Sequence, residues 1–260
     1  MTVRNPGFGA VATHWFSELA EHMGPAYERY SFTKGTDQEV EALIELLGIS
    51  PGQRVLDVGC GTGRHSRVLA AAGFEVVGVD ISPRFVSLAS EQAGPNEQYL
   101  LGDARALAFD AEFDGVISLC QGAFGLTGGP GAEDMLPLRE LDEAILEGIA
   151  TALKPGARAA VSAFSAYFQL RHGDALEAFD ARLGVHHEHT EVRDDAGVAV
   201  PAELWTTCFT PRELRLMARA VGLRPLDVHG VTPGGYGPFP PGTNEPEFLL
   251  VAERSAADHR

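Results

Sequence analysis

The stretch RVLDVGCGTGRHS, residues 54–66, places a short apolar run ahead of three alternate glycines and a helical pattern. Glycines let the backbone approach a ligand closely, and a helix that begins after such a loop directs free N–H groups at it. This order is typical of α/β folds that bind nucleotide-like ligands. The dinucleotide fingerprint G-x-G-x-x-G is absent, because Arg64 and Ser66 stand where its third glycine would fall.

Asp57 ends the apolar run beside the glycine loop. A carboxylate there would repel a pyrophosphate, but it could hold a cationic amino group directly or through water. We therefore expect a nucleotide-like ligand that lacks a pyrophosphate.

Short apolar runs alternate with helical patterns on the C-terminal side of this motif. The pattern predicts strands at 54–59, 75–80, 99–103, 113–119 and 157–164, with helices at 64–72, 83–92 and 138–153. Runs without polar alternation are typical of strands buried on both faces. The sequence therefore predicts an α/β fold with a parallel sheet, helices on both faces and right-handed crossovers.

Two segments depart from this alternation. Residues 1–50 carry helical patterns near 14–23 and from Thr36, where Thr36 and Glu39 have the spacing of a capping box. Residues 165–209 contain two strand patterns joined by a turn at 194–197. We expect one domain over residues 1–260, with 1–50 as an N-terminal helical cover and 165–209 as an inserted cap between strands five and six.

The chain then returns to the alternating pattern. Thr210, Pro211 and Glu213 supply the N-cap, first-turn proline and N3 partner of a helix. Strand patterns at 223–231 and 247–254 follow, separated by a loop rich in glycine and proline. Loops of this length are usually functional, and we expect this one to act as a lid.

Composition disfavours several classes of protein. A net charge of −16 opposes binding to a polyanion and disfavours a nucleic-acid partner. Cys60, Cys120 and Cys208 are odd in number and widely spaced, which disfavours a disulfide framework or structural zinc and favours the cytoplasm. The sequence has no signal-like N-terminal segment and no run of 18 uncharged apolar residues, so we expect no membrane association.

Five segments in order resemble the motifs of one family. They are LDVGCGTG (56–63), VVGVDIS (76–82), LLGDARAL (100–107), FDGVISLCQGAFG (113–125) and LKPGARAAVS (153–162). Together they resemble the class I S-adenosylmethionine-dependent methyltransferases. This resemblance implies a Rossmann-like, doubly wound, seven-stranded sheet that is mostly parallel, with its last strand antiparallel.

The resemblance also implies S-adenosylmethionine as cofactor and S-adenosylhomocysteine as product. Asp80 would accept hydrogen bonds from both ribose hydroxyls, Asp103 would bind the adenine amino group, and Ala104 would offer its backbone N–H. In isolation, Asp80 could equally cap a helix and Asp103 could be a turn residue. The full predicted set of cofactor contacts is Tyr30, Asp57, Gly59, Cys60, Gly61, Gly63, Asp80, Ile81, Asp103, Ala104 and Cys120.

The methyl acceptor is expected to be a small metabolite methylated on O, N or C. After Leu119 the chain lacks the Asn/Asp-Pro-Pro-aromatic signature with which related enzymes hold a flat amide or amine. Aromatic side chains suit a partly apolar acceptor, although many of them could simply close the core. The predicted acceptor contacts are Tyr27, Gln121, Phe124, Tyr167 and Tyr236.

A general base is needed only if the acceptor must lose a proton. His187 and His189 would share one strand face, where they could supply a base or two metal ligands; a solvated strand face is the favoured alternative. His14 is a third candidate base. We assign no metal, and Cys120 lacks the preceding proline expected of a C5-cytosine nucleophile.

Two other functions are compatible with parts of this pattern. A nicotinamide-dependent oxidoreductase would share the strand, loop and helix, but Asp57, Arg64 and Ser66 argue against it. A non-catalytic protein that binds S-adenosylmethionine would share every cofactor motif. The sequence does not indicate an oligomeric state.

Overall fold

The computed structural model describes residues 14–120, 122–130, 138–172 and 178–256. Seven strands form the central sheet in the order β3-β2-β1-β4-β5-β10-β9. Their bounds are β1 (Arg54–Val58), β2 (Glu75–Asp80), β3 (Glu97–Leu101), β4 (Phe113–Ser118), β5 (Leu153–Ser165), β9 (Leu223–Val231) and β10 (Glu247–Arg254). All neighbouring pairs are parallel except those of β10, which runs antiparallel to β5 and β9. The predicted doubly wound sheet with an antiparallel last strand is confirmed.

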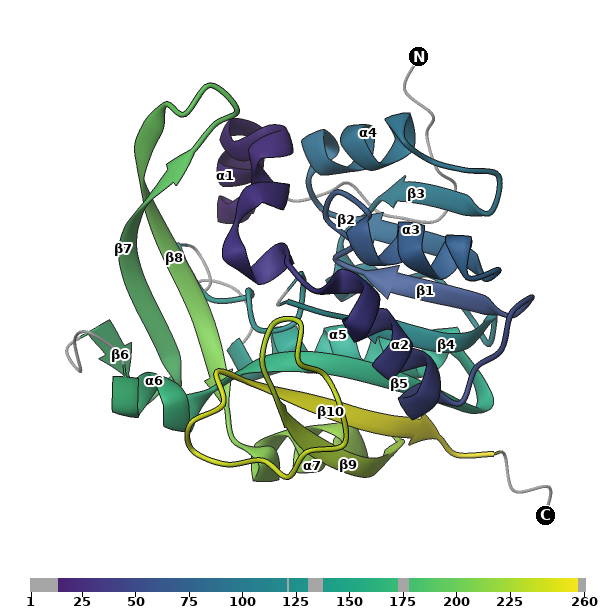
Figure 1. Ribbon diagram of the computed structural model, residues 1–260. Helices are drawn as coiled ribbons and strands as arrows, with labels where there is room; N and C mark the ends of the chain where they lie inside the picture. The colour runs from purple at the N-terminus through teal and green to yellow at the C-terminus, as the bar shows by residue number, and fades with distance from the viewer. Residues whose placement is uncertain (1–13, 121, 131–137, 173–177, 257–260) are drawn as a thin grey trace.

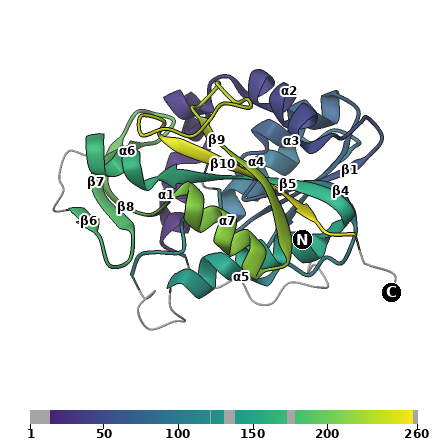
Figure 2. The ribbon, with the colours of Figure 1, turned by 90° about the horizontal axis from the view of Figure 1, so that it is seen from below.

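Helices cover both faces of this sheet (Figures 1 and 2). One core joins the sheet to α5 (Leu138–Ala152) and α7 (Pro211–Ala220), and a second joins it to α2 (Thr36–Leu47) and α3 (Arg64–Ala71). The strands alternate between them, because Leu56 belongs to the first core and Val55 to the second. Shorter elements complete the cover: α1 (Trp15–Met23), η1 (Gly24–Arg29), η2 (Ser31–Thr33), α4 (Pro83–Glu91), η3 (Ala104–Ala106) and α6 (Ala166–His172).

The segment between β5 and α7 extends the central sheet. It contains α6, the short β6 (Phe179–Asp180) and a long hairpin of β7 (Val185–Arg193) and β8 (Ala199–Phe209). β8 pairs in parallel with the last two residues of β5, beyond the end of β4. The predicted inserted cap is therefore continuous with the sheet. Figure 1 shows α1 lying between this hairpin and α4.

One of the two predicted capping boxes forms. The Thr210 side chain accepts from the Glu213 N–H at the start of α7, and Glu213 accepts from the Thr210 N–H in return. At α2 the prediction was wrong, because the N-cap is Gly35 in a left-handed conformation with no side-chain cap. Glu39 is instead fully buried and binds groups from α3 and from the loop after β9.

Thr210→Ala should lower the free energy of unfolding by about 1 kcal/mol, because the N–H of Glu213 loses its acceptor. Urea denaturation would measure the change. The matched variant Glu213→Gln keeps an acceptor for the Thr210 N–H and should cost less than about 0.5 kcal/mol. Equal losses in the two variants would contradict this account of the helix start.

The loop at 232–246 packs on α2 and does not lie over the sheet edge as a lid. Gly234 N donates to Glu39 Oε1 at 2.7 Å, and the backbone of Tyr236 makes two hydrogen bonds to Gln38. Tyr236 is 2% exposed and belongs to the α2 core. The loop approaches the start of α2 so closely that glycine is required there, because a Cβ on Gly35 would lie 2.3 Å from Gly234 Cα. In this structure residues 234–236 of the predicted lid are therefore packed against α2, whereas Phe239 further along the loop is 54% exposed.

No helix in the described part of the chain combines the length and apolar composition needed to cross a lipid bilayer.

Candidate functional site

Two adjoining cavities lie where β1, β2 and β4 end. The larger has a volume of about 340 Å³ and is enclosed by α1, η1, the β7–β8 hairpin and the start of β10. The smaller is a narrow cleft of about 40 Å³ beside the ends of β2 and β3. Gly59, Asp80 and Gly122 line both cavities. A ligand with two dissimilar halves can therefore lie across these three residues.

Asp80 is held where the two cavities meet. Its Oδ2 accepts from Gly61 N and its Oδ1 from Ser82 N, both at 2.8 Å. Burial raises the pKa of Asp80 to about 6, although the N–H groups of Ser82 and Gly61 stabilise its ionised form. A carboxylate fixed in this way has remaining lone pairs that can accept from ligand hydroxyls.

The glycine loop lies closer to the β4 loop than any side chain would permit. Gly59 has φ +73°, and a Cβ on it would lie 2.1 Å from the carbonyl carbon of Gly122. Its N–H donates to Val79 O at 2.7 Å, which fixes the loop against the end of β2. The backbone therefore forms part of both cavity walls, as predicted for a loop that approaches its ligand closely.

Ile81, Asp103 and Ala104 line the small cleft. Asp103 accepts from the N–H of Arg105 and also from its guanidinium, with the shortest contact 2.6 Å to Nη2. Burial would raise the pKa of Asp103, but the Arg105 bonds outweigh it and the pKa is lowered. Asp103 is therefore ionised and half-buried in the cleft wall, and any further donor would share it with Arg105.

His14 lies in the same cleft with both ring nitrogens engaged. Nδ1 accepts from Phe16 N at 3.2 Å, which caps α1, and Nε2 lies 3.0 Å from Leu126 O. This pattern requires the neutral Nε2–H tautomer, and burial lowers the pKa of the ring. The one lone pair of His14 is thus used as a helix cap in this structure, which argues against its predicted role as a general base.

Three predicted cofactor contacts lie behind the glycine loop, outside the lining of both cavities. Asp57 is 2% exposed and accepts from Ser66 Oγ at 2.7 Å, while burial raises its pKa. The Cys60 side chain packs with Tyr99, and a Cβ on Gly63 would lie 2.5 Å from the Tyr99 hydroxyl. In this structure these residues pack behind the glycine loop and do not line the cavities.

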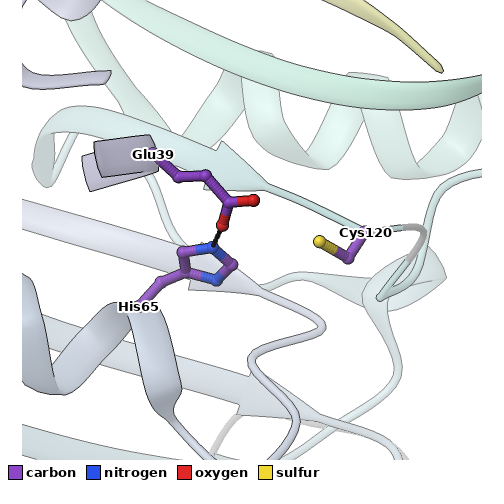
Figure 3. A group of neighbouring side chains, drawn as sticks. All are labelled: Glu39, His65 and Cys120. Atoms are coloured by element: carbon purple, nitrogen blue, oxygen red, sulfur yellow. Dashed lines mark hydrogen bonds and ion pairs between the residues drawn. The ribbon is translucent and has the colours of Figure 1, made fainter. Parts of the chain in front are cut away.

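Cys120 lines the large cavity beside a buried polar network. Figure 3 shows Glu39 and His65 joined by a hydrogen bond, with the Cys120 sulfur close by. Glu39 Oε2 lies 2.7 Å from His65 Nε2 and 2.9 Å from Arg64 Nη1, and Arg64 Nη2 lies 2.7 Å from the Cys120 sulfur.

Glu39, His65 and Cys120 could geometrically surround a metal ion, but the Arg64 guanidinium already bonds to two of them. Burial raises the pKa of the Cys120 thiol, which opposes a nucleophilic thiolate. Cys120 also has φ +51°, a strained conformation that its backbone hydrogen bond to Ser162 Oγ helps to hold.

The walls of the large cavity are mostly aromatic and aliphatic. Tyr27 and Tyr30 line it as predicted, and Tyr30 Oη accepts from Arg193 N of the hairpin. Sequence reasoning missed most of the other residues that line the cavity, because aromatic residues at helical spacing are equally typical of the hydrophobic core. Further apolar lining comes from Trp15, Phe16, Met23, Phe32, Phe85, Leu126, Phe164, Val192 and Leu204.

Other predicted acceptor contacts lie elsewhere. Phe124 is fully buried and stacks on Phe209 in the sheet core, and Tyr167 is 40% exposed beside Phe248. Tyr236 is buried next to the large cavity, and its hydroxyl donates to Glu247, which lines that cavity. None of these three side chains lines either cavity in this structure, so their predicted contact with the acceptor has no support from its geometry. Gln121 lies outside the described residues.

His187 and His189 come together, but not at the cavity. Both approach Glu203, at 3.2 and 3.7 Å, and His187 stacks on Trp205. Strand alternation places this group on one face of the hairpin, while Thr190 and Leu204 line the cavity from the other. Their placement argues against a general base from these histidines and agrees with the alternative of a partly solvated strand face.

Glu247 is a functional candidate that sequence reasoning missed. It is 5% exposed, lines the large cavity at the start of β10, and accepts from the Tyr236 hydroxyl at 3.4 Å. An acidic residue before the apolar run FLLVA was a usable signal, because the first residue of an antiparallel last strand lies at the carboxyl edge of its parallel neighbours. The combined site suits a ligand that places a hydroxylated centre at Asp80 and a positively charged, partly apolar group in the large cavity.

Comparisons with known proteins agree with this geometry. A family described as a methyltransferase domain matches residues 55–156. The cypemycin N-terminal methyltransferase of a Streptomyces species is 35% identical over 225 residues, which cover 78% of this chain and 84% of that protein. The 2-methyl-6-phytyl-1,4-hydroquinone methyltransferase of Synechocystis is 39% identical over 119 residues, covering 43% of this chain and 37% of that protein.

The fold has close structural relatives as well. The CcbJ methyltransferase of Streptomyces caelestis superposes with a TM-score of 0.73 at 19% identity, covering 94% of this chain and 99% of that one.

Proposed function

This chain belongs to the S-adenosylmethionine-dependent methyltransferases, and from that premise we propose that it methylates a small molecule bound in its large cavity. S-adenosylmethionine supplies an electrophilic methyl carbon on a positively charged sulfur. The other requirements are alignment of the acceptor and exclusion of water. Both are properties of the cavity walls.

We assign the two adjoining cavities to the two halves of such a cofactor. Asp80 at their junction would accept from the ribose hydroxyls, and the cleft lined by Ile81, Asp103 and Ala104 would take the adenine end. The loop at Gly59 and Gly61 would run beside the methionine end, facing the large cavity. The single observation that carries the proposal is the position of Asp80, whose carboxylate is fixed by two backbone N–H groups where the cavities meet.

The large cavity supports a small, partly apolar acceptor. Its mainly aromatic and aliphatic lining would exclude water around the transferred methyl group. A net charge of −16 opposes a polyanionic acceptor such as nucleic acid. The curated relatives are named for different acceptors, an N-terminus in one case and a hydroquinone in the other, so their names leave the methylated atom open.

Calorimetric titration with S-adenosylhomocysteine tests the proposal, with NADH as the control ligand. We expect S-adenosylhomocysteine alone to bind, at micromolar affinity or about −8 kcal/mol. Binding of NADH alone would overturn the proposal in favour of an oxidoreductase. Transfer from isotopically labelled S-adenosylmethionine to a panel of small amines, phenols and alcohols is the second measurement. Cofactor binding without transfer to any of them would favour the non-catalytic alternative.

A further inference from the structure

The charged residues of the large cavity all have the same sign. Asp80, Glu191 and Glu247 line it, and none of its described lining residues is a lysine, arginine or histidine. The walls are otherwise rich in aromatic rings, whose faces attract cations. The cavity thus combines negative charge with apolar surface, which suits a cationic acceptor and disfavours an acceptor that carries a carboxylate or phosphate.

The three carboxylates have different surroundings. Asp80 accepts from two backbone N–H groups at the junction with the cleft. Glu191 is exposed and lies 3.5 Å from Arg193. It alternates along β7 with His187 and His189, so its carboxylate lies on the strand face away from the cavity, and the negative charge inside comes from Asp80 and Glu247. Glu247 is buried at the cavity floor, where the nearby Tyr236 hydroxyl donates to its Oε2. Its position at the start of β10, in register with Phe164 at the carboxyl end of β5, directs it to the edge of the sheet at which ligands bind.

We propose that Glu247 is the recognition site for the amino group of the acceptor, so that the enzyme methylates the nitrogen of an apolar amine. This inference rests on the proposed methyl transfer and narrows its substrate class. The cationic amine would donate to the Glu247 carboxylate, and its apolar body would pack on the surrounding rings, including Tyr27 and Phe164.

The charge balance of the reaction fits a carboxylate at this place. A protonated amine has no lone pair, so one proton must pass from the ammonium to Glu247 or to solvent before transfer. The nitrogen lone pair then forms the new N–C bond, while the C–S bond breaks and its electron pair stays on sulfur. The product leaves as a methylated ammonium, and a protonated Glu247 returns its proton to solvent.

A purely structural role for Glu247 is the competing account. In that case its bond to Tyr236 would hold the start of β10, and the cavity would not distinguish an amine from an uncharged molecule of the same shape. Phenethylamine and 2-phenylethanol form such a pair, because they differ only in the amino and hydroxyl groups.

The experiment is calorimetric titration of the protein, saturated with S-adenosylhomocysteine, with each of these two probes. We expect the amine to bind at least about tenfold more tightly than the alcohol, because a buried carboxylate forms a charge-assisted bond with it. Glu247→Gln keeps the size of the side chain and should abolish the preference. The control Glu203→Gln removes one charge from the hairpin face away from the cavity and should keep it.

Three results would each overturn the proposal. They are equal affinities for the two probes, no binding of the amine at concentrations up to about 10 mM, and a preference for the amine that is unchanged in Glu247→Gln. The comparison of probes on the unaltered protein keeps the test valid if the variant does not fold. Binding of S-adenosylhomocysteine is measured first, so the two proposals fail separately. If S-adenosylhomocysteine does not bind, the proposed function is wrong. If it binds but the protein does not prefer the amine, only the proposed role of Glu247 is wrong.

Discussion

Asp80→Ala is expected to weaken the binding of S-adenosylhomocysteine by about 100-fold, or roughly 2.7 kcal/mol. Two losses combine in this variant. The ribose hydroxyls lose their acceptor, and the N–H groups of Gly61 and Ser82 lose the carboxylate that orders the glycine loop and the start of α4. Isothermal titration calorimetry measures the affinity, and urea denaturation of the same sample establishes that the variant is folded.

The pH dependence of binding gives the same residue a second test. Because the pKa of Asp80 is about 6, the free protein takes up a proton there as the pH falls below about 6. Wild-type affinity should therefore decline below that pH and be constant above about 7, whereas the decline should be reduced in Asp80→Ala. The exposed Asp37 on α2 provides the control Asp37→Asn, which should leave both properties unchanged. Wild-type affinity in Asp80→Ala would refute the assignment.

Glu39→Gln should lower the free energy of unfolding by about 3 kcal/mol or more. The carboxylate is fully buried and binds Arg64, His65 and the backbone N–H of Gly234. An amide of the same shape leaves the Arg64 charge uncompensated and places an NH₂ group opposite one of these donors. Urea denaturation at neutral pH would measure the loss, which is a large fraction of a typical domain's stability.

The exposed Glu41 on the same helix supplies the matched control, and Glu41→Gln should change stability by less than about 0.5 kcal/mol. Burial would raise the pKa of Glu39, but the bonds and charges of His65, Gly234 and Arg64 leave it lowered. Its stabilisation is therefore present at neutral pH and is lost as the pH falls through that lowered pKa. The difference between Glu39→Gln and wild type should accordingly narrow in acid. A small loss in Glu39→Gln at neutral pH would show that the network contributes little.

The sheet and the cofactor half of the site could be predicted because their signals are local. Continuous apolar strands, alternate glycines and carboxylates at strand ends all occupy single short stretches of the chain. Their joint spacing singled out Gly59, Asp80, Asp103 and Ala104, all of which line the cavities in this structure. The fold of this half follows from hydrophobic pattern and backbone geometry, which a single sequence carries directly.

The acceptor half depends on pairings between distant segments. Glu39 has the spacing of a capping residue, yet its partners come from α3 and from a loop 195 positions later. His187 and His189 were placed correctly on one strand face, but only the pairing of β7 with β8 and the packing of α1 decide which face borders the cavity. Glu247 was missed for a similar reason, because its place before the run FLLVA indicates the ligand-binding edge only through the antiparallel pairing of β10 with β5.

The inserted segment leaves and rejoins the sheet at neighbouring positions, since Phe164 and Ser165 of β5 lie in register with Cys208 and Phe209 of β8. Chain excursions whose ends meet can be lengthened, shortened or exchanged at little entropic cost to the remainder of a domain. One wall of the large cavity can thus diverge by recombination while the junction at Asp80 stays in place. For protein engineering, residues 166–207 are a natural unit to exchange with the corresponding segment of a related enzyme, in order to change which acceptor is bound.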